Sequence, residues 1–159
     1  MLQIPRRVEY ALRAVLTLAR APKDARLSFK DIADCEDIPR DYLAKILRTL
    51  VDADLVESKR GANGGYKLAR PAEALSFLEV IEAADSPVAV NLCTEFGNGC
   101  DRSNDCALAS VWQTAENAMR QVFAATTIAD VLRSPLTFDR LAGSAATEAA
   151  KVDQPCADL

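Results

Sequence analysis

The sequence predicts a mainly α fold with a small β-hairpin wing, in which a winged helix-turn-helix domain is followed by a long dimerisation helix. Three observations favour this class. Apolar residues recur at spacings of three and four over the first fifty positions, a glycine-rich hairpin signal follows them, and a long amphipathic segment begins near residue 103. A chain of 159 residues can form one well-packed domain with an appendage.

The first fifty residues predict three helices. The first covers residues 4–20 and ends before Pro22. The second starts at Ser28, where Ser28-x-x-Asp31 resembles a capping box, and a short turn over 36–38 follows it. The third starts at Pro39, and its buried side is traced by Leu43, Ile46, Leu47, Leu50 and Val51.

Two strands are predicted next, over residues 55–59 and 66–69. The segment between them is RGANGGY, in which Asn63-Gly64 is expected to supply the positive φ angles of a tight hairpin. Helix, turn, helix and hairpin in this order are the winged helix-turn-helix pattern, so residues 1–72 are predicted to form that domain.

The remainder predicts a second region over 73–135 and a disordered tail over 136–159. A capped helix starts at Ser76, a long helix starts at Ser103, and a short helix starts at Thr127. The long helix is too long for a small domain to cover, and the economical partner is the same helix of a second copy. Its apolar stripe is predicted to comprise Leu108, Val111, Trp112, Ala115, Met119, Val122 and Phe123.

The charge is unevenly divided between the two halves. Residues 1–70 hold 14 Lys and Arg against 10 Asp and Glu, whereas the remainder holds 5 against 13. A basic half indicates a polyanionic partner even though the whole chain has a net charge of -4. The predicted contacts with double-stranded DNA are therefore on the third helix and the wing, at Arg40, Tyr42, Lys45, Arg48, Lys59 and Arg60.

Three of the five cysteines lie within fourteen residues, at Cys93, Cys100 and Cys106, and the chain has no histidine. The only early apolar run, residues 14–19, is too short for a signal peptide or a membrane span, so the chain is expected to be cytoplasmic and to have no membrane partner. In a reducing compartment, clustered thiols favour metal binding or redox chemistry over structural disulfides. Thiolates are soft ligands that suit iron-sulfur clusters or zinc.

Four stretches together resemble the iron-sulfur-responsive winged-helix regulators, the family whose familiar members are IscR, NsrR and RirA. They are EYALRAVLTLA, IPRDYLAKILRTLVDADLVES, RGANGGYKLARP, and the cysteine segment with the helix after it. The resemblance covers residues 1 to about 135. It implies a homodimeric regulator, acting as a repressor at a pseudo-palindromic operator, whose DNA affinity depends on a cluster held by Cys93, Cys100 and Cys106.

The resemblance also bears on the fourth ligand. The cysteine spacing is C-x6-C-x5-C instead of the C-x5-C-x5-C of IscR and NsrR, and the histidine that serves as fourth ligand in IscR is replaced by Ala109. In NsrR-like relatives an acidic residue of the first helix reaches the cluster of the other subunit, and Glu9 occupies the corresponding position. Three thiolates and one oxygen favour [4Fe-4S] over [2Fe-2S], with oxygen, nitric oxide or iron as the signal.

Other readings of the residues remain open. The cysteines could oxidise directly in a cluster-free thiol regulator, or they could hold structural zinc. An electron carrier would have no need of the wing. An enzyme is disfavoured because the chain lacks a histidine base, a phosphate-binding glycine loop and a metallohydrolase motif. Cys35, on the second helix, is expected to be a small buried residue and not a ligand.

Overall fold

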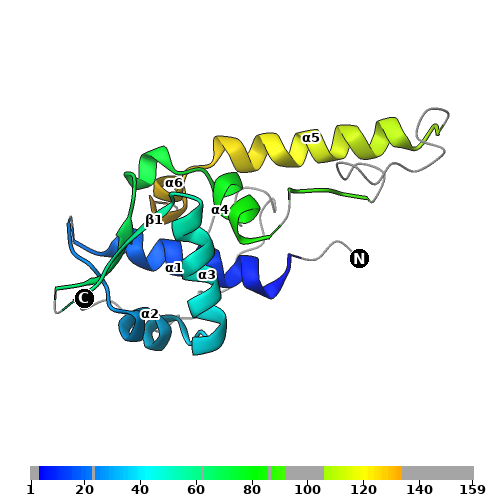
Figure 1. Cartoon of the computed structure of the whole chain (residues 1–159). Helices are drawn as coiled ribbons and strands as arrows, with labels where there is room; N and C mark the ends of the chain where they lie inside the picture. Colours follow the sequence, from blue (N-terminus) through cyan, green and yellow to red (C-terminus); the bar gives the residue numbers. More distant parts are fainter. Residues whose placement is uncertain (1–3, 23, 62, 86, 92–105, 134–159) are drawn as a thin grey trace, which may run out of the picture.

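The computed structural model describes residues 4–22, 24–61, 63–85, 87–91 and 106–133. Within them it confirms the predicted class, a mainly helical chain with one two-stranded antiparallel hairpin (Figure 1). The predicted tail at 136–159 lies outside the described residues. The elements in chain order are α1 (Arg6–Arg20), α2 (Phe29–Glu36), α3 (Arg40–Asp52), β1 (Val56–Lys59), β2 (Gly65–Leu68), the 3-10 helix η1 (Ala72–Ala74), α4 (Phe77–Ala84), α5 (Ala109–Ala125) and α6 (Ile128–Arg133).

Helix α1 is the centre of the fold. It begins at Arg6, two residues later than predicted, and packs against α2, α3, α4, α6 and β2. Its small residues Ala11 and Ala14 are fully buried, which allows the other helices to approach its backbone closely. The larger buried side chains come from α1 itself and from the elements around it, and they include Val15, Ile32, Leu43, Leu47, Leu50, Leu75, Val80 and Ile128.

The helix-turn-helix is fixed by local signals that the sequence carries. Ser28 and Asp31 form the predicted capping box at the start of α2, with both hydrogen bonds at 3.1 Å. The helix ends at Glu36, and the next residue, Asp37, adopts the left-handed conformation with φ of 49°. Ile38 is then buried, and Pro39 precedes the first residue of α3. The turn between α2 and α3 is therefore short and well determined.

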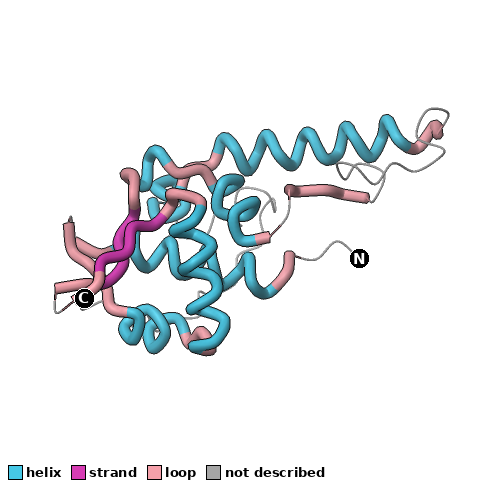
Figure 2. Tube along the Cα trace, viewed as in Figure 1, coloured by secondary structure: helices cyan, strands magenta, loops and turns pink. Residues whose placement is uncertain are grey.

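The wing is a hairpin of two strands (Figure 2). The strands are antiparallel, and Val56 pairs with Leu68 and Lys59 with Gly65. Tyr66 also exchanges two backbone hydrogen bonds of 2.9 Å with Leu27, so the wing is anchored to the segment before α2. The prediction of positive φ at Asn63 and Gly64 is wrong, because in the described part of this turn the positive angles fall at Gly61 and Gly65. Gly64 is needed for a different reason: a Cβ there would lie 2.3 Å from the Lys59 carbonyl oxygen.

Gly65→Ala is expected to destabilise the wing more than Gly61→Ala does. Both residues have positive φ, but only at Gly65 would the new Cβ clash, at 2.5 Å from the Leu27 carbonyl oxygen. Backbone strain alone costs about 1–3 kcal/mol, and the clash adds to it. Urea unfolding of the two variants measures the difference, and equal losses of unfolding free energy would contradict the clash.

Helices α4 and α6 are tied to each other at their N-termini. Phe77 N–H donates to the Thr126 carbonyl and Ile128 N–H donates to the Leu75 carbonyl, at 2.8 and 2.9 Å. Capping boxes start α4 at Ser76 and α6 at Thr127, as predicted. Hydrogen bonds from Thr127, and then from Arg133, lower the pKa of Asp130 to about 2, so its carboxylate caps α6 throughout the physiological pH range.

Helix α5 differs from the prediction in two ways. It starts later than predicted, and its apolar residues lie on two sides of the helix and not on one. It begins at Ala109, not at Ser103, because residues 107 and 108 form a turn and no side chain caps the helix. Along one side, Arg120 binds Glu82 at 2.5 Å and the Phe123 ring packs on Phe77 with centroids 5.6 Å apart. None of the residues of α5 is fully buried within the protomer, and its N-terminal part extends beyond the other described helices (Figure 1).

Among the described residues, no helix combines the length and the apolar character needed to cross a membrane.

Candidate nucleic-acid interface and thiol site

Helix α3 presents a cationic face opposite the side that it buries. Lys45 is exposed and has no ion pair within the described part of the chain. Arg40 and Arg48 form only long, exposed pairs, with Asp34 at 3.9 Å and with Asp52 at 3.8 Å. Such pairs contribute little to stability, so these guanidinium groups can turn to another anion at small cost.

The wing divides its cations into two kinds. Lys59 and Arg60, at the end of β1, are exposed and make no ion pair with any other described residue. Lys67 and Arg26 instead converge on Glu57, at 3.5 and 3.0 Å. The Glu57 cluster therefore holds β1, β2 and the segment before α2 together, while Lys59 and Arg60 remain available to a ligand.

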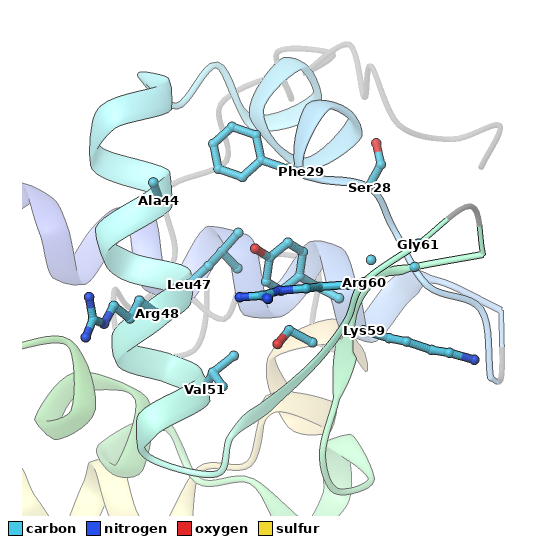
Figure 3. Close-up of a pocket in the computed structure, with 13 residues that line it drawn as sticks. Ser28, Phe29, Ala44, Leu47, Arg48, Val51, Lys59, Arg60 and Gly61 are labelled. Carbon is cyan, nitrogen blue, oxygen red and sulfur yellow. The ribbon is translucent and has the colours of Figure 1, made fainter.

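A groove of about 530 Å³ separates α3 from the wing (Figure 3). The Arg60 side chain extends across it toward α3, whereas Lys59 points away on the far side of the hairpin. Apolar side chains form part of its surface and cations stand at its rim. The lining residues are Ser28, Phe29, Ala44, Leu47, Arg48, Val51, Ser58, Lys59, Arg60, Gly61, Gly64, Gly65 and Tyr66. A DNA strand, whose sugars can contact the apolar side chains and whose phosphates can bind the cations, matches this groove.

Tyr42 lies at the start of α3 with 54% of its surface exposed. Its ring makes an edge contact with Tyr10 of α1, with centroids 6.2 Å apart at an interplanar angle of 68°. The Arg13 guanidinium lies over the same Tyr10 ring, 6.0 Å from its centroid. The exposed aromatic residue of α3 is thus supported by a ring of α1.

Of the three predicted thiol ligands, the structure describes Cys106, which is half-buried three residues before α5 and whose backbone carbonyl accepts a hydrogen bond from Ala109 N–H. Cys93 and Cys100 lie outside the described residues. On the other side of that gap, Val90 N–H donates to Glu116 of α5 at 3.3 Å. Across the described part of the chain, no group of Cys, Asp or Glu is arranged to hold a metal ion. Cys35 is half-buried on α2, less covered than expected.

Glu9 is on the surface of α1, with 53% of its side chain exposed. Within the described chain its carboxylate has one ion pair, a long contact of 4.0 Å to Arg13 one turn later. Weak pairing and high exposure leave the carboxylate free to bind a group that approaches from outside the protomer.

A second exposed feature is a stripe along α5. The residues Leu108, Val111, Ala115, Ala118, Val122 and Ala125 are all exposed and recur at alternating spacings of three and four. This is the spacing of a coiled-coil seam. The predicted single apolar stripe is therefore two: Phe123 packs on α4, while the α5 seam, as we call these six residues, faces outward.

Residues 4–134 match the Rrf2 family, which is described as an "Iron-dependent Transcriptional regulator". The chain belongs to the Rrf2 family. Two similar relatives are a putative HTH-type transcriptional regulator of Mycobacterium tuberculosis, 37% identical with 79% of this chain and 78% of the relative covered, and NsrR of Geobacillus kaustophilus, 34% identical with 82% and 90% covered. These relatives are regulators and not enzymes, as the sequence predicted.

Solved structures of similar proteins confirm the winged-helix fold of this Rrf2 protein. CymR, the global cysteine regulator of B. subtilis, is 27% identical, with 84% of this chain and 98% of CymR covered at a TM-score of 0.69. The oxidized form of Staphylococcus aureus CymR is 26% identical, with 86% and 100% covered at 0.67. IscR of T. potens, at 23% identity and a TM-score of 0.68 with 91% and 94% covered, supports the fold alone.

Sequence reasoning missed several residues of this Rrf2 protein's site. Phe29 and Ser58 line the groove, and Arg26 fixes the wing through Glu57. Arg13 and Glu36 meet although they are 23 residues apart. No periodicity joins residues on different elements, so only a signal of paired substitutions among relatives could have revealed these contacts.

Proposed function

We propose that this protein is a homodimeric transcription repressor that binds a pseudo-palindromic DNA operator and is controlled by an iron-sulfur cluster. The observation that carries the DNA-binding part is the set of cations without strong ion pairs on α3 and the wing, on both sides of one groove. Family membership supports the same reading. In this proposal α3 enters the major groove, and Lys59 and Arg60 bind the flanking phosphates.

The α5 seam supports the dimer. It has Val111 and Val122 toward its ends and Ala115 and Ala118 in the middle, and large exposed side chains such as Leu108 at 61% are costly to leave in water. Small residues in the middle permit close approach of a second helix. A second copy of the same seam is self-complementary under a two-fold axis, which would place two α3 helices on successive half-sites of a duplex.

The cluster part of the proposal rests on the chemistry of the donors. Cys93, Cys100 and Cys106 supply three soft thiolates, and no histidine is present to be the fourth ligand. The exposed Glu9 carboxylate of the partner subunit would complete the set, and a [4Fe-4S] cluster is favoured over [2Fe-2S]. When bound, the cluster supplies a centre that reacts with oxygen or nitric oxide. Glu9 is on α1, and α1 packs against α3. Loss of the bond between Glu9 and the cluster would therefore act on the helix that supports the DNA-binding helix.

A thiol-based mechanism without a cluster is the second candidate. The observation that favours it is the similarity to CymR, whose S. aureus form is known in an oxidized state. In that case direct oxidation of cysteine would change the affinity for DNA. The third candidate is a structural zinc ion bound by the same cysteines.

Protein purified without air separates these candidates. Stoichiometric iron, acid-labile sulfide and visible absorbance would support the cluster. Zinc in place of iron would support a structural site, and metal-free protein whose DNA binding responds to peroxide would support thiol control.

Two variants test the ligands. Cys106→Ala is expected to lose the cluster. Glu9→Ala is expected to retain the cluster when purified without air but to lose it faster than the native protein after exposure to air, because the bond from a hard oxygen ligand to a soft cluster is the weakest of the four. The decay of visible absorbance after exposure to air is the measurement. Glu73→Ala, which removes an exposed carboxylate from η1, is the control. A cluster lifetime in Glu9→Ala equal to that of the native protein would remove Glu9 from the ligand set.

A further inference from the structure

We propose that Arg13 of α1 is a positioning residue for DNA recognition, which sets the orientation of α3 by holding the end of α2. The inference rests on the DNA-binding part of the proposed function and does not depend on the cluster. It concerns a residue that does not itself lie on α3 or the wing.

The contact joins Arg13 to Glu36, the last residue of α2. Arg13 Nε donates to Glu36 Oε2 at 3.0 Å, and Arg13 Nη2 donates to the Glu36 backbone carbonyl. The buried Thr17 hydroxyl donates to the other carboxylate oxygen. Only 13% of the Glu36 side chain is exposed, so its carboxylate accepts hydrogen bonds from α1 in place of most of those that water would donate.

The contact lies where α2 ends, so it can affect the orientation of α3. The Glu36 carbonyl is one of the carbonyls at the C-terminal end of α2, and a guanidinium is a favourable partner for that negative end of the helix dipole. Only Asp37, Ile38 and Pro39 separate Glu36 from α3. Asp37 is in the left-handed conformation and Ile38 is buried, so the turn has little freedom of its own. A shift of the end of α2 must therefore be passed to the start of α3.

Arg13 also acts on α3 by a second route. It lies over the Tyr10 ring, and Tyr10 supports the exposed Tyr42 at the start of α3. The Arg13 guanidinium thus contacts both the backbone carbonyl of the last residue of α2 and the Tyr10 ring, which packs against Tyr42. A lysine could provide the charge, but it has no planar fork that can donate to carboxylate and carbonyl while stacking on a ring.

The test compares Arg13→Met with the double variant Arg13→Met/Glu36→Met. The single variant leaves the Glu36 carboxylate without its cation and should lower the melting temperature. The double variant removes the stranded carboxylate and should recover most of that loss. If Arg13 positions α3, both variants bind a selected duplex about tenfold more weakly than the native protein, the effect of losing one charge-assisted hydrogen-bonded contact.

Three further measurements make the test specific. Affinity for random duplex and the salt dependence of binding should stay native in the double variant, because the phosphate-binding cations of α3 and the wing are unchanged. Arg13→Lys should bind as weakly as Arg13→Met. Arg133→Met, which removes another ion-paired arginine from α6, should bind as the native protein does. All proteins are compared at equal iron content.

Native affinity for the selected duplex in the double variant would overturn the proposal and leave Arg13 with a stabilising role only. Equal losses for selected and random duplex would overturn it as well. The duplex is selected from random sequence by the native protein. Failure of the native protein to select any duplex would instead refute the proposed function, so the two failures are distinguishable.

Discussion

The double variant Lys45→Gln/Arg60→Gln is expected to bind its operator on the order of 100-fold more weakly than the native protein at near-physiological salt. Both side chains are exposed and have no ion pair among the described residues, so their charges are available to DNA. Lys45 is on α3 and Arg60 is on the wing, the two elements that the groove separates, and of the two residues only Arg60 lines the groove. Their loss removes contacts from both parts of the interface at once.

The dependence of affinity on salt identifies the cause. Each phosphate contact contributes about 0.9 to the slope of log affinity against log salt concentration. The slope should therefore fall by up to about 2 for each protomer if both cations bind phosphates. Titration of a labelled duplex at several salt concentrations measures it. A variant that loses affinity with an unchanged slope would show that these side chains read bases and not phosphates.

Arg133→Glu is the matched control for this prediction, because it changes the net charge by the same two units. Arg133 is on α6, which packs on α1 and η1. Binding close to native is expected. A loss similar to that of the double variant would mean that overall charge, and not the α3 and wing surface, determines affinity.

Ala118→Glu is expected to convert the protein to a monomer and to reduce operator affinity by about 10²–10⁴, the usual gain from linking two binding modules. Ala118 is exposed in the middle of the α5 seam, so its substitution should not disturb the fold of the protomer. In a dimer the same position would bury a carboxylate against its own copy, where it has neither water nor a cation. Light scattering coupled to size-exclusion chromatography measures the mass, and duplex titration measures the affinity.

Ala124→Glu makes the same chemical change on another side of α5 and should remain dimeric. Ala124 is also exposed, but it is not part of the α5 seam. If Ala118→Glu remains a dimer with native affinity, the α5 seam is not the dimer interface. If both variants become monomers, the introduced charge acts through the stability of α5, which thermal unfolding would detect.

The helix-turn-helix was predictable because its signals are local. Ser28 and Asp31 are three residues apart and form their capping box within one turn of helix. The buried positions Leu43, Ile46, Leu47 and Leu50 follow from the helical period alone. Val51, predicted to be buried with them, is only half-buried because it lines the groove between α3 and the wing. The exposed cations of α3 were predictable for the same reason, since they are the positions that this period leaves outside. The wing cations Lys59 and Arg60 were predictable from their place next to the glycine-rich turn of the hairpin.

Predictions failed where two parts of the chain decide the outcome together. The sequence placed positive φ at Gly64, but the approach of Leu27 to the wing puts it at Gly65. The sequence also merged the apolar residues of α5 into one stripe. The packing of Phe123 on Phe77 turns one set of them inward and leaves Val111 and Val122 outside.

The sequence by itself determined the winged-helix class, the cationic face of α3 and the supply of three soft thiolates without a histidine, because each depends on residue type and spacing along a single segment. The tertiary structure alone decided that Arg13 holds the end of α2, that Arg26 and Lys67 share Glu57, and that the α5 seam faces outward. These are contacts between segments far apart in the chain, and the free energy that selects them comes from packing and charge pairing in three dimensions.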